Sequence, residues 1–212
     1  MKISLLVTLV GLIHCTAAAQ GALEPCPIAP FNPYYDGVNR VIDKAVGRAS
    51  SLHLTTLPSF EAETGLRLVG TEVYFVQFRA QFWSGSVRLQ RDGSYRMDFA
   101  KPNIITRVRH APLTPAIMKR VQEVYARAVS TAKKQNNVGL DGETYLISPT
   151  GMPCAFAWSP APETANGRLI ALMRRLEIHA TLSAPSQLQR SEREIAELLL
   201  VLERDYGGLK NN

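Results

Sequence analysis

The sequence predicts an α+β domain, an antiparallel sheet with about four helices packed on one face. Runs of segments that alternate apolar and polar residues are separated by runs with helical spacing, which favours this class. The composition, 46% hydrophobic and 20% charged, is typical of a globular protein. Because no long linker interrupts the pattern, we expect a single domain over 34–208, followed by a tail at 209–212.

Residues 1–19 have the organisation of a secretory signal peptide. Met1-Lys2 gives a positive start, Ile3–Ile13 is an apolar run, and Ala17–Ala19 supplies the small residues that a signal peptidase reads. The run is too short to span a bilayer, and no stop-transfer segment follows it. We therefore expect cleavage before Gln20, a periplasmic or extracellular location, and no transmembrane segment in the mature chain.

The first predicted elements follow the signal. Residues 20–33 form an extended arm, because four prolines block regular structure there. A helix is expected over 36–49, where apolar residues recur on one face behind a capping aspartate. Short strands are expected at 52–57 and 66–69. A longer strand is expected at 72–83, where apolar and polar residues alternate over the whole length.

A hairpin follows these strands. Val87 and Leu89 alternate with polar residues, and Asp92-Gly93 supplies the turn because glycine accepts a positive φ. Tyr95 and Met97 then return on the same side as the first pair. We expect this apolar side to face the core, as in a half-buried sheet.

The second half is predicted to be richer in helix. Residues 104–110 form a strand or an extended link. A long helix then begins at Thr114-Pro115, a cap followed by a proline suited to the first turn. A second hairpin covers 144–158, and a helix carries apolar residues at helical spacing over 169–176. The capping-box sequence Ser191–Glu194 is expected to open the last helix.

Three cysteines are present, and two remain after the expected cleavage. Cys15 lies inside the signal, where lipidation is the weaker alternative because His14 stands in place of a small residue. We expect Cys26 and Cys154 to form a disulfide in an oxidising compartment. That bridge closes a long loop and is worth about 4–5 kcal/mol in the chain-entropy model. Two buried thiols are the alternative, and the spacing does not fit a metal site.

Catalytic motifs are almost absent. Ser130–Lys133 matches the S-x-x-K motif of penicillin-recognising serine enzymes, but the partner motifs S-D-N and K-T-G are missing. There is also no H-E-x-x-H, G-x-S-x-G, Walker loop or G-x-G-x-x-G. His53, His110 and His179 have no neighbours at ligand spacing, so we interpret them as surface or packed residues. The sequence assigns no catalytic residue and implies no cofactor or metal.

Positive charge is concentrated in one segment. The whole chain carries +6, and residues 79–134 hold twelve Lys and Arg against three Asp and Glu. On the predicted strands, several arginines project from one face, where like charges on adjacent strands repel. This clustering indicates an anionic partner, with an ordinary solvated face as the alternative. The candidate binding residues are Arg79, Arg88, Arg96, Arg107 and Arg109.

These observations predict an exported binding or interaction domain rather than an enzyme. Its partner is expected to be an anionic envelope component or an acidic protein, for example a delivered toxin that an immunity-type inhibitor blocks. Nucleic acid does not suit the location, and no nucleic-acid motif is present. The alternative is a small envelope hydrolase whose site is assembled only by the fold. A concave pocket with converging titratable residues would favour the hydrolase.

Overall fold

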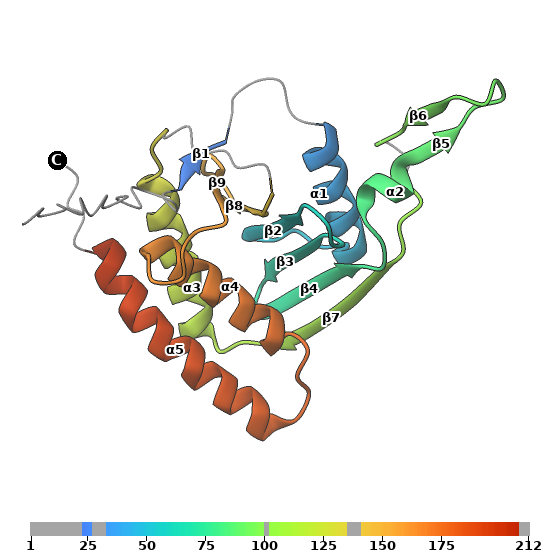
Figure 1. Cartoon of the computed structure of the whole chain (residues 1–212). Helices are drawn as coiled ribbons and strands as arrows, with labels where there is room; N and C mark the ends of the chain where they lie inside the picture. The colour runs from blue at the N-terminus through green and yellow to red at the C-terminus, as the bar shows by residue number, and fades with distance from the viewer. Residues whose placement is uncertain (1–22, 27–32, 100–101, 135–140, 208–212) are drawn as a thin grey trace, which may run out of the picture.

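The computed structural model describes residues 23–26, 33–99, 102–134 and 141–207 (Figure 1). The predicted signal peptide, most of the proline-rich arm and the tail at 209–212 lie outside these residues. The α+β class is confirmed. Within the described chain, no helix is both long enough and apolar enough to cross a bilayer.

A seven-stranded antiparallel sheet forms the centre of the molecule, in the order β1-β9-β8-β2-β3-β4-β7. Its strands are β1 (Glu24–Pro25), β2 (Leu52–Pro58), β3 (Thr64–Val69), β4 (Glu72–Phe78), β7 (Thr106–Pro112), β8 (Glu143–Pro149) and β9 (Ala155–Trp158). Strands β2, β3 and β4 are consecutive in the chain, and a tight turn with Gly70 at φ 58° joins the last two. The outer strands are β1 and β7.

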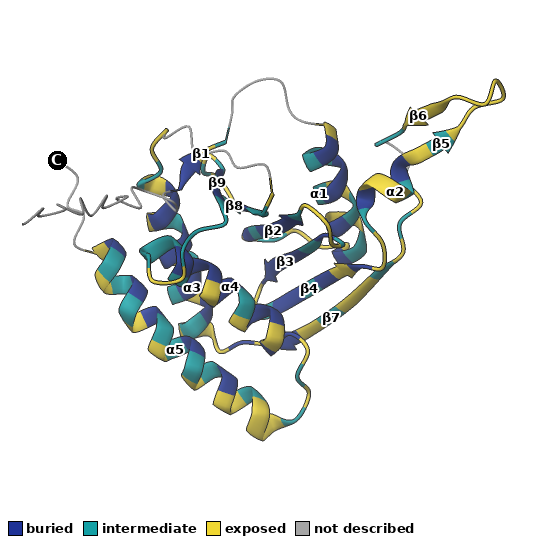
Figure 2. Cartoon of the chain, in the orientation of Figure 1, coloured by how far each residue is buried: buried dark blue, intermediate teal, exposed yellow. Residues whose placement is uncertain are grey.

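The helices are divided between the two faces of this sheet. One face carries α3 (Pro115–Ser130), α4 (Ala165–His179) and α5 (Pro185–Gly207), which share a core with β2, β3 and β8. The other carries α1 (Pro33–Val46) and the short α2 (Phe82–Ser86) over a second core. The structure thus corrects the expectation that the helices gather on one face. Figure 2 shows the cause, because buried residues run along both β3 and β4.

Strand β3 shows how both faces are buried. Leu66 and Leu68 belong to the core under α3–α5, whereas Gly65 and Arg67 face α1. A Cβ atom at Gly65 would lie 2.5 Å from Cδ1 of Ile42, so any larger residue would require the Ile42 side chain of α1 to shift. Strands buried on both faces lack the simple alternation that marks a solvated sheet.

The predicted strand at 72–83 is shorter than expected. β4 ends at Phe78, and α2 begins at Phe82. The Ser86 hydroxyl donates to the Phe82 carbonyl at 2.8 Å, which closes the short helix. Phe82 is fully buried and stacks on Phe99 with ring centroids 5.9 Å apart. A spacing of four residues between apolar positions fits both a strand and a helical turn, so the pattern alone could not show the change.

The last helix begins earlier than predicted. It starts at Pro185, a residue that suits the first helical turn, and the expected cap Ser191 lies inside it. Ser191 is buried, and its hydroxyl contacts His179 Nδ1 at 3.1 Å. The other ring nitrogen, Nε2, donates to the Pro112 carbonyl at 2.7 Å, because a carbonyl oxygen only accepts. His179 is therefore a packed residue that joins α4, α5 and β7.

The predicted hairpin forms, but it leaves the body of the protein. β5 (Val87–Leu89) and β6 (Tyr95–Met97) make a separate two-stranded ribbon that projects outward (Figure 1). Gly93 occupies the turn at φ 82°. Leu89 and Tyr95 are 66% and 75% exposed, so the expectation that this apolar side faces the core is corrected. Residues 87–97 are called the projecting ribbon below.

The predicted disulfide is confirmed. Cys26 and Cys154 are bonded, with Cα atoms 5.4 Å apart. The Cys26 amide also donates to the Cys154 carbonyl at 3.0 Å, which extends the pairing of β1 with β9. The bridge and this pairing together fasten the segment before α1 to the edge of the sheet.

Candidate functional site

The structure separates the five candidate arginines into two groups. Arg79, Arg107 and Arg109 lie at the β7 side of the main sheet. Arg88 and Arg96 are register partners on the projecting ribbon. The single face expected from the sequence is thus two surfaces, because the chain leaves the sheet at α2 before the ribbon forms.

The first group shares one face of two paired strands. Arg107 is the register partner of Gln77, which precedes Arg79 by two residues. The Arg79 amide donates to the Ile105 carbonyl at 3.0 Å and so continues the ladder. Since register partners and alternate residues point the same way, Arg79, Arg107 and Arg109 project from the same face. These three residues are called the arginine edge.

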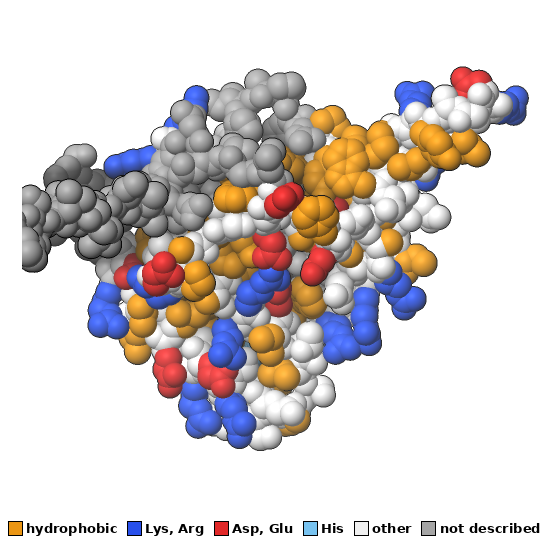
Figure 3. All heavy atoms as spheres, viewed as in Figure 1, with side chains coloured by type: hydrophobic (Ala, Val, Ile, Leu, Met, Phe, Trp, Pro, Cys, Tyr) orange, Lys and Arg blue, Asp and Glu red, His pale blue; other side chains and the backbone are white. Residues whose placement is uncertain are grey.

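The charges of the arginine edge are not neutralised by described residues. Arg79 and Arg107 are exposed and Arg109 is half-buried, and none of them forms an ion pair within the described chain. Figure 3 shows Lys and Arg side chains gathered over the β7 side of the molecule. Like charges on neighbouring strands repel, so this surface is a candidate for contact with an anionic partner.

Strand β7 itself offers a second kind of contact. Among the described strands it pairs only with β4, so its outer side presents backbone N–H and C=O groups before Pro112, whose carbonyl accepts from His179. Such an edge is a template for another strand. Charged residues on an edge strand also discourage aggregation, and this protection is the alternative explanation for Arg107 and Arg109.

The projecting ribbon has one cationic side and one apolar side. The Arg88 guanidinium donates to the carbonyls of Gly85 and Val87 at 3.0 and 3.2 Å, and Arg96 is exposed opposite it. On the other side, apolar side chains continue from the body onto the ribbon (Figure 3). Trp83 at its base is 48% exposed. An isolated two-stranded ribbon is marginally stable in water, so this apolar side is a second candidate contact surface.

A buried carboxylate fixes the base of the ribbon. Glu63 accepts a hydrogen bond of 2.5 Å from the Tyr34 hydroxyl and one of 2.7 Å from the Phe82 amide. Burial, reinforced by the bond to Glu63, raises the pKa of Tyr34 far above its ordinary value. Tyr34 also stacks on Trp83 with ring centroids 4.8 Å apart. These contacts join α1 to α2 and set the direction in which the ribbon leaves.

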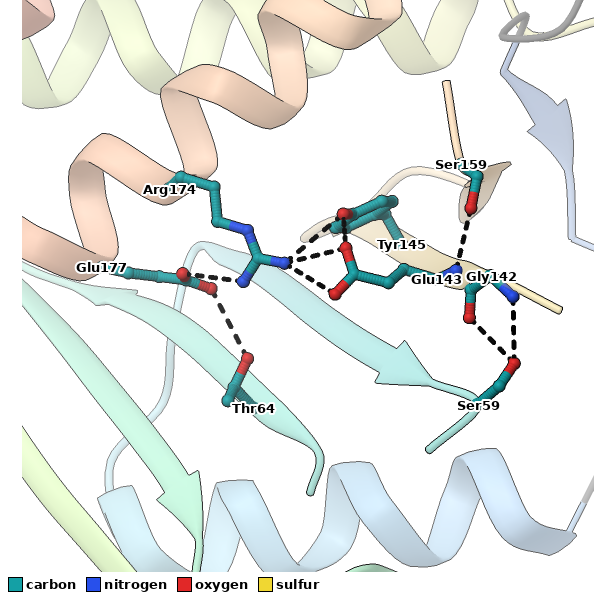
Figure 4. A network of polar contacts seen from close by, with 8 residues as sticks. All are labelled: Ser59, Thr64, Gly142, Glu143, Tyr145, Ser159, Arg174 and Glu177. Carbon is teal, nitrogen blue, oxygen red and sulfur yellow. Dashed lines mark hydrogen bonds and ion pairs between the residues drawn. The ribbon is translucent and has the colours of Figure 1, made fainter. Parts of the chain in front are cut away.

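A network of polar contacts surrounds Arg174 on α4 (Figure 4). Arg174 Nη2 donates to both carboxylate oxygens of Glu143, at 3.0 and 2.9 Å, and Nη1 donates to Glu177 at 3.1 Å. The Tyr145 hydroxyl donates to Glu143, and the Thr64 hydroxyl donates to Glu177 at 3.5 Å. Every carboxylate oxygen in this network has a donor from the protein.

The network holds neighbouring elements together and is not arranged as a catalytic acid–base pair. Burial raises the pKa of Glu177, and the attraction of Arg174 offsets this only in part. Burial also raises the pKa of Tyr145 to about 12. A catalytic carboxylate must reach a substrate, whereas Glu143 and Glu177 are occupied by Arg174 and its neighbours. The network therefore fixes α4 against β3 and β8.

The sequence-based catalytic candidates are not assembled. Ser130 is the last residue of α3 and donates to the Arg127 carbonyl at 2.7 Å, so Lys133 does not lie one helical turn beyond it. His110 stacks on Tyr74 at the protein surface, 4.9 Å between ring centroids. No group of three or more His, Cys, Asp or Glu among the described residues is arranged to hold a metal ion.

The structure contains a pocket that the sequence did not predict. A pocket of about 510 Å³ lies between α1 and the segment that leads into β7. Its described lining is Gly37, Arg40, Val41, Lys44, Ala45, Phe99, Pro102, Ile104 and Thr106. The one sequence feature that could have indicated this pocket is the spacing of Arg40 and Lys44, which lie four residues apart on α1. The opposite wall comes from a distant segment, and no local pattern indicates that it lies there. This feature is called the basic pocket.

The geometry of these surfaces is the basis on which their function is proposed. Comparisons with protein-family models, with curated proteins and with solved structures gave no significant match.

Proposed function

We propose that the chain is an exported binding protein whose arginine edge recognises an acidic protein. The observation that carries this proposal is the position of Arg79, Arg107 and Arg109. They share one face and lack ion pairs among the described residues, and Arg107 and Arg109 lie on an edge strand whose outer side has no partner strand in the described part of the chain. Arginine suits the task because its planar guanidinium binds a carboxylate through two parallel hydrogen bonds.

Strand addition to β7 gives the mode of contact. An extended acidic segment of the partner pairs its backbone with the outer side of β7, and its alternate side chains lie on the same face as Arg107 and Arg109. The backbone bonds supply affinity, and the carboxylates select the register. An immunity-type inhibitor that covers a delivered toxin is one form of such a protein.

The basic pocket supports binding over hydrolysis. Its described lining offers the cations Arg40 and Lys44 and the hydroxyl of Thr106, but no carboxylate, imidazole or thiol. Those groups suit the binding of an anion, and the described lining holds none of the carboxylate, imidazole or thiol groups that most often serve as the base or nucleophile of a hydrolase.

A matched pair of variants tests the proposal. The edge variant carries Arg79→Gln, Arg107→Gln and Arg109→Gln. The control carries Lys119→Gln, Arg190→Gln and Arg193→Gln, which remove the same charge from exposed positions on α3 and α5. The probes are a labelled peptide of alternating Glu and Val and, separately, vesicles of phosphatidylglycerol. Binding is measured at about 0.05 M and about 0.3 M salt, since screening acts mainly on exposed charges.

The expected result is peptide binding that weakens with salt, falls at least about tenfold in the edge variant and is unchanged in the control. Equal losses in both variants would reduce the effect to net charge and overturn the proposal. Capture by the vesicles without binding of the peptide would replace the acidic protein with a lipid surface. Circular dichroism checks that both variants fold, because exposed charges contribute only about 0–1 kcal/mol to stability.

A further inference from the structure

A second site lies away from the arginine edge, on the α1 face of the sheet. Thr106, which lines the basic pocket, is the register partner of Phe78 in the core beneath α1. Arg107 is the next residue, and its side chain points to the opposite face. The pocket and the arginine edge are therefore independent surfaces.

The two walls of the pocket differ in origin but share an apolar floor. From α1 come Val41 and Ala45, four residues apart on one side of the helix, and from the segment before β7 come Phe99 and Ile104. All four are half-buried and pack against the core beneath α1. The floor is thus the rim of a hydrophobic core, and a ligand with an apolar body gains contact there.

The mouth of the pocket is cationic. Arg40 and Lys44 are exposed on consecutive turns of α1, and neither forms an ion pair with a described residue. Asp43, between them in sequence, accepts a hydrogen bond from Arg67 at 2.6 Å, so its charge is paired with Arg67. Like charges four residues apart cost an isolated helix about 0.2–0.5 kcal/mol. The helix dipole stabilises a cation at Lys44, which lies near the C-terminus of α1, but it does not explain the presence of a cation at Arg40.

We propose that the basic pocket binds a single-chain anionic amphiphile. The carboxylate or phosphate head lies between Arg40 and Lys44, and the hydrocarbon chain lies on Val41, Ala45 and Phe99. The volume of about 510 Å³ falls within the range of small-molecule sites. A purely polar anion would leave the apolar floor uncovered, and a neutral lipid would leave two cations unpaired. This combination of charge and floor selects a ligand that has both parts.

The protein contains its own reporter of occupancy. Trp83 meets Phe99 edge-to-face with ring centroids 5.1 Å apart, and Phe99 lines the pocket. The only other tryptophan is Trp158, which lies on β9. In a Trp158→Phe background, the fluorescence of Trp83 reports on ligand that contacts Phe99.

Dodecanoate is the probe, titrated below its micelle concentration with Trp83 fluorescence and calorimetry as readouts. Dodecyl phosphate tests the alternative head group. Dodecyltrimethylammonium carries the same chain with the opposite charge, and acetate carries the head without the chain. One variant is Arg40→Gln with Lys44→Gln, and its control is Lys119→Gln with Arg190→Gln. A third variant, Ala45→Leu, fills the floor and leaves the charge unchanged.

We expect one molecule of dodecanoate or dodecyl phosphate to bind per chain, and neither acetate nor the cationic amphiphile to do so. The Arg40/Lys44 variant should bind at least about tenfold more weakly, since hydrogen bonds to charged groups are lost, and Ala45→Leu should also weaken binding. The control should bind like the wild type. The proposal is overturned by equal binding of the cationic amphiphile, by an unaffected Arg40/Lys44 or Ala45→Leu variant, by an equal loss in the control, or by no binding.

Discussion

Arg67 Nε donates a hydrogen bond of 2.6 Å to Asp43 across the boundary between β3 and α1. The Arg67 side chain is completely buried, whereas the Asp43 side chain is 46% exposed. Burial lowers the pKa of Arg67, and the charge of Asp43 works against that shift. The remaining donors bond Asn39 at 3.0 Å and the Leu66 carbonyl at 2.9 Å. A buried cation is thus satisfied by one charged partner at the protein surface.

Replacing that partner is expected to destabilise the protein. Asp43→Asn leaves the Arg67 charge buried without an opposite charge, and we expect a loss of about 3 kcal/mol, the lower end for a broken buried pair. Urea unfolding monitored by circular dichroism measures it. Asp36→Asn on the same helix is the control and should cost less than about 1 kcal/mol. Equal losses would mean that Asp43 is not the essential partner of Arg67.

Glu177 is expected to give an unusual pH dependence. Its pKa is raised in the folded protein, mainly by burial, so its contribution to stability is complete below the unfolded value of about 4.3. That contribution is lost as pH rises through the folded value. Glu177→Gln removes this loss, so the stability of the variant relative to the wild type should increase from acidic to neutral pH. A difference that stays constant with pH would contradict this.

Glu203 should behave in the opposite way. Its carboxylate accepts bonds of 2.7 and 3.0 Å from Arg120, and these hydrogen bonds lower its pKa. Its contribution is present above the unfolded value and is lost as pH falls through the folded one. We expect Glu203→Gln to lower stability by about 0.5–1 kcal/mol at neutral pH and to match the wild type in acid. Denaturant titrations of the Glu177→Gln and Glu203→Gln variants at several values from acidic to neutral pH compare their opposite pH dependences directly.

The projecting ribbon is expected to contribute little to the free energy of unfolding. Leu89→Ala with Tyr95→Ala should change stability by about 0.5 kcal/mol or less, because both side chains are exposed. Leu66→Ala, in the core, should cost about 2–5 kcal/mol. Thermal and urea unfolding of both variants test the contrast. A large loss in the ribbon variant would place those side chains in a buried contact.

Local spacing predicted most of the elements. The strands that became β2 and β3, the helix that begins at Pro115 and both hairpins follow from patterns within a few residues of each other. The pair Cys26 and Cys154 followed from counting, since no other cysteine remains after the expected cleavage. These predictions depended on nothing distant in the chain.

The errors arose where distant segments decide the outcome. Alternation at Val87 and Leu89 correctly predicted a strand, but it carries no information about what covers the apolar side. Ser191 has the sequence of a cap, yet its hydroxyl is used by His179 from another helix. The sequence placed five arginines on one face, whereas Arg107 and Arg109 lie with Arg79 on the main sheet and Arg88 and Arg96 lie on the ribbon; their role in binding stays a prediction.

The pairing of β1 with β9 has a consequence for the order of assembly. The strands β2, β3, β4 and β7 pair in sequence order, so this half of the sheet is complete by residue 112. β1 precedes all of them, yet its partner is β9, and Cys154 follows Cys26 by 128 positions. A chain delivered from its N-terminus therefore holds β2 as an open edge until β8 arrives. Pairing with β8 ends the interval in which that edge is available for intermolecular pairing, and oxidation of the two thiols then fixes β1 against β9.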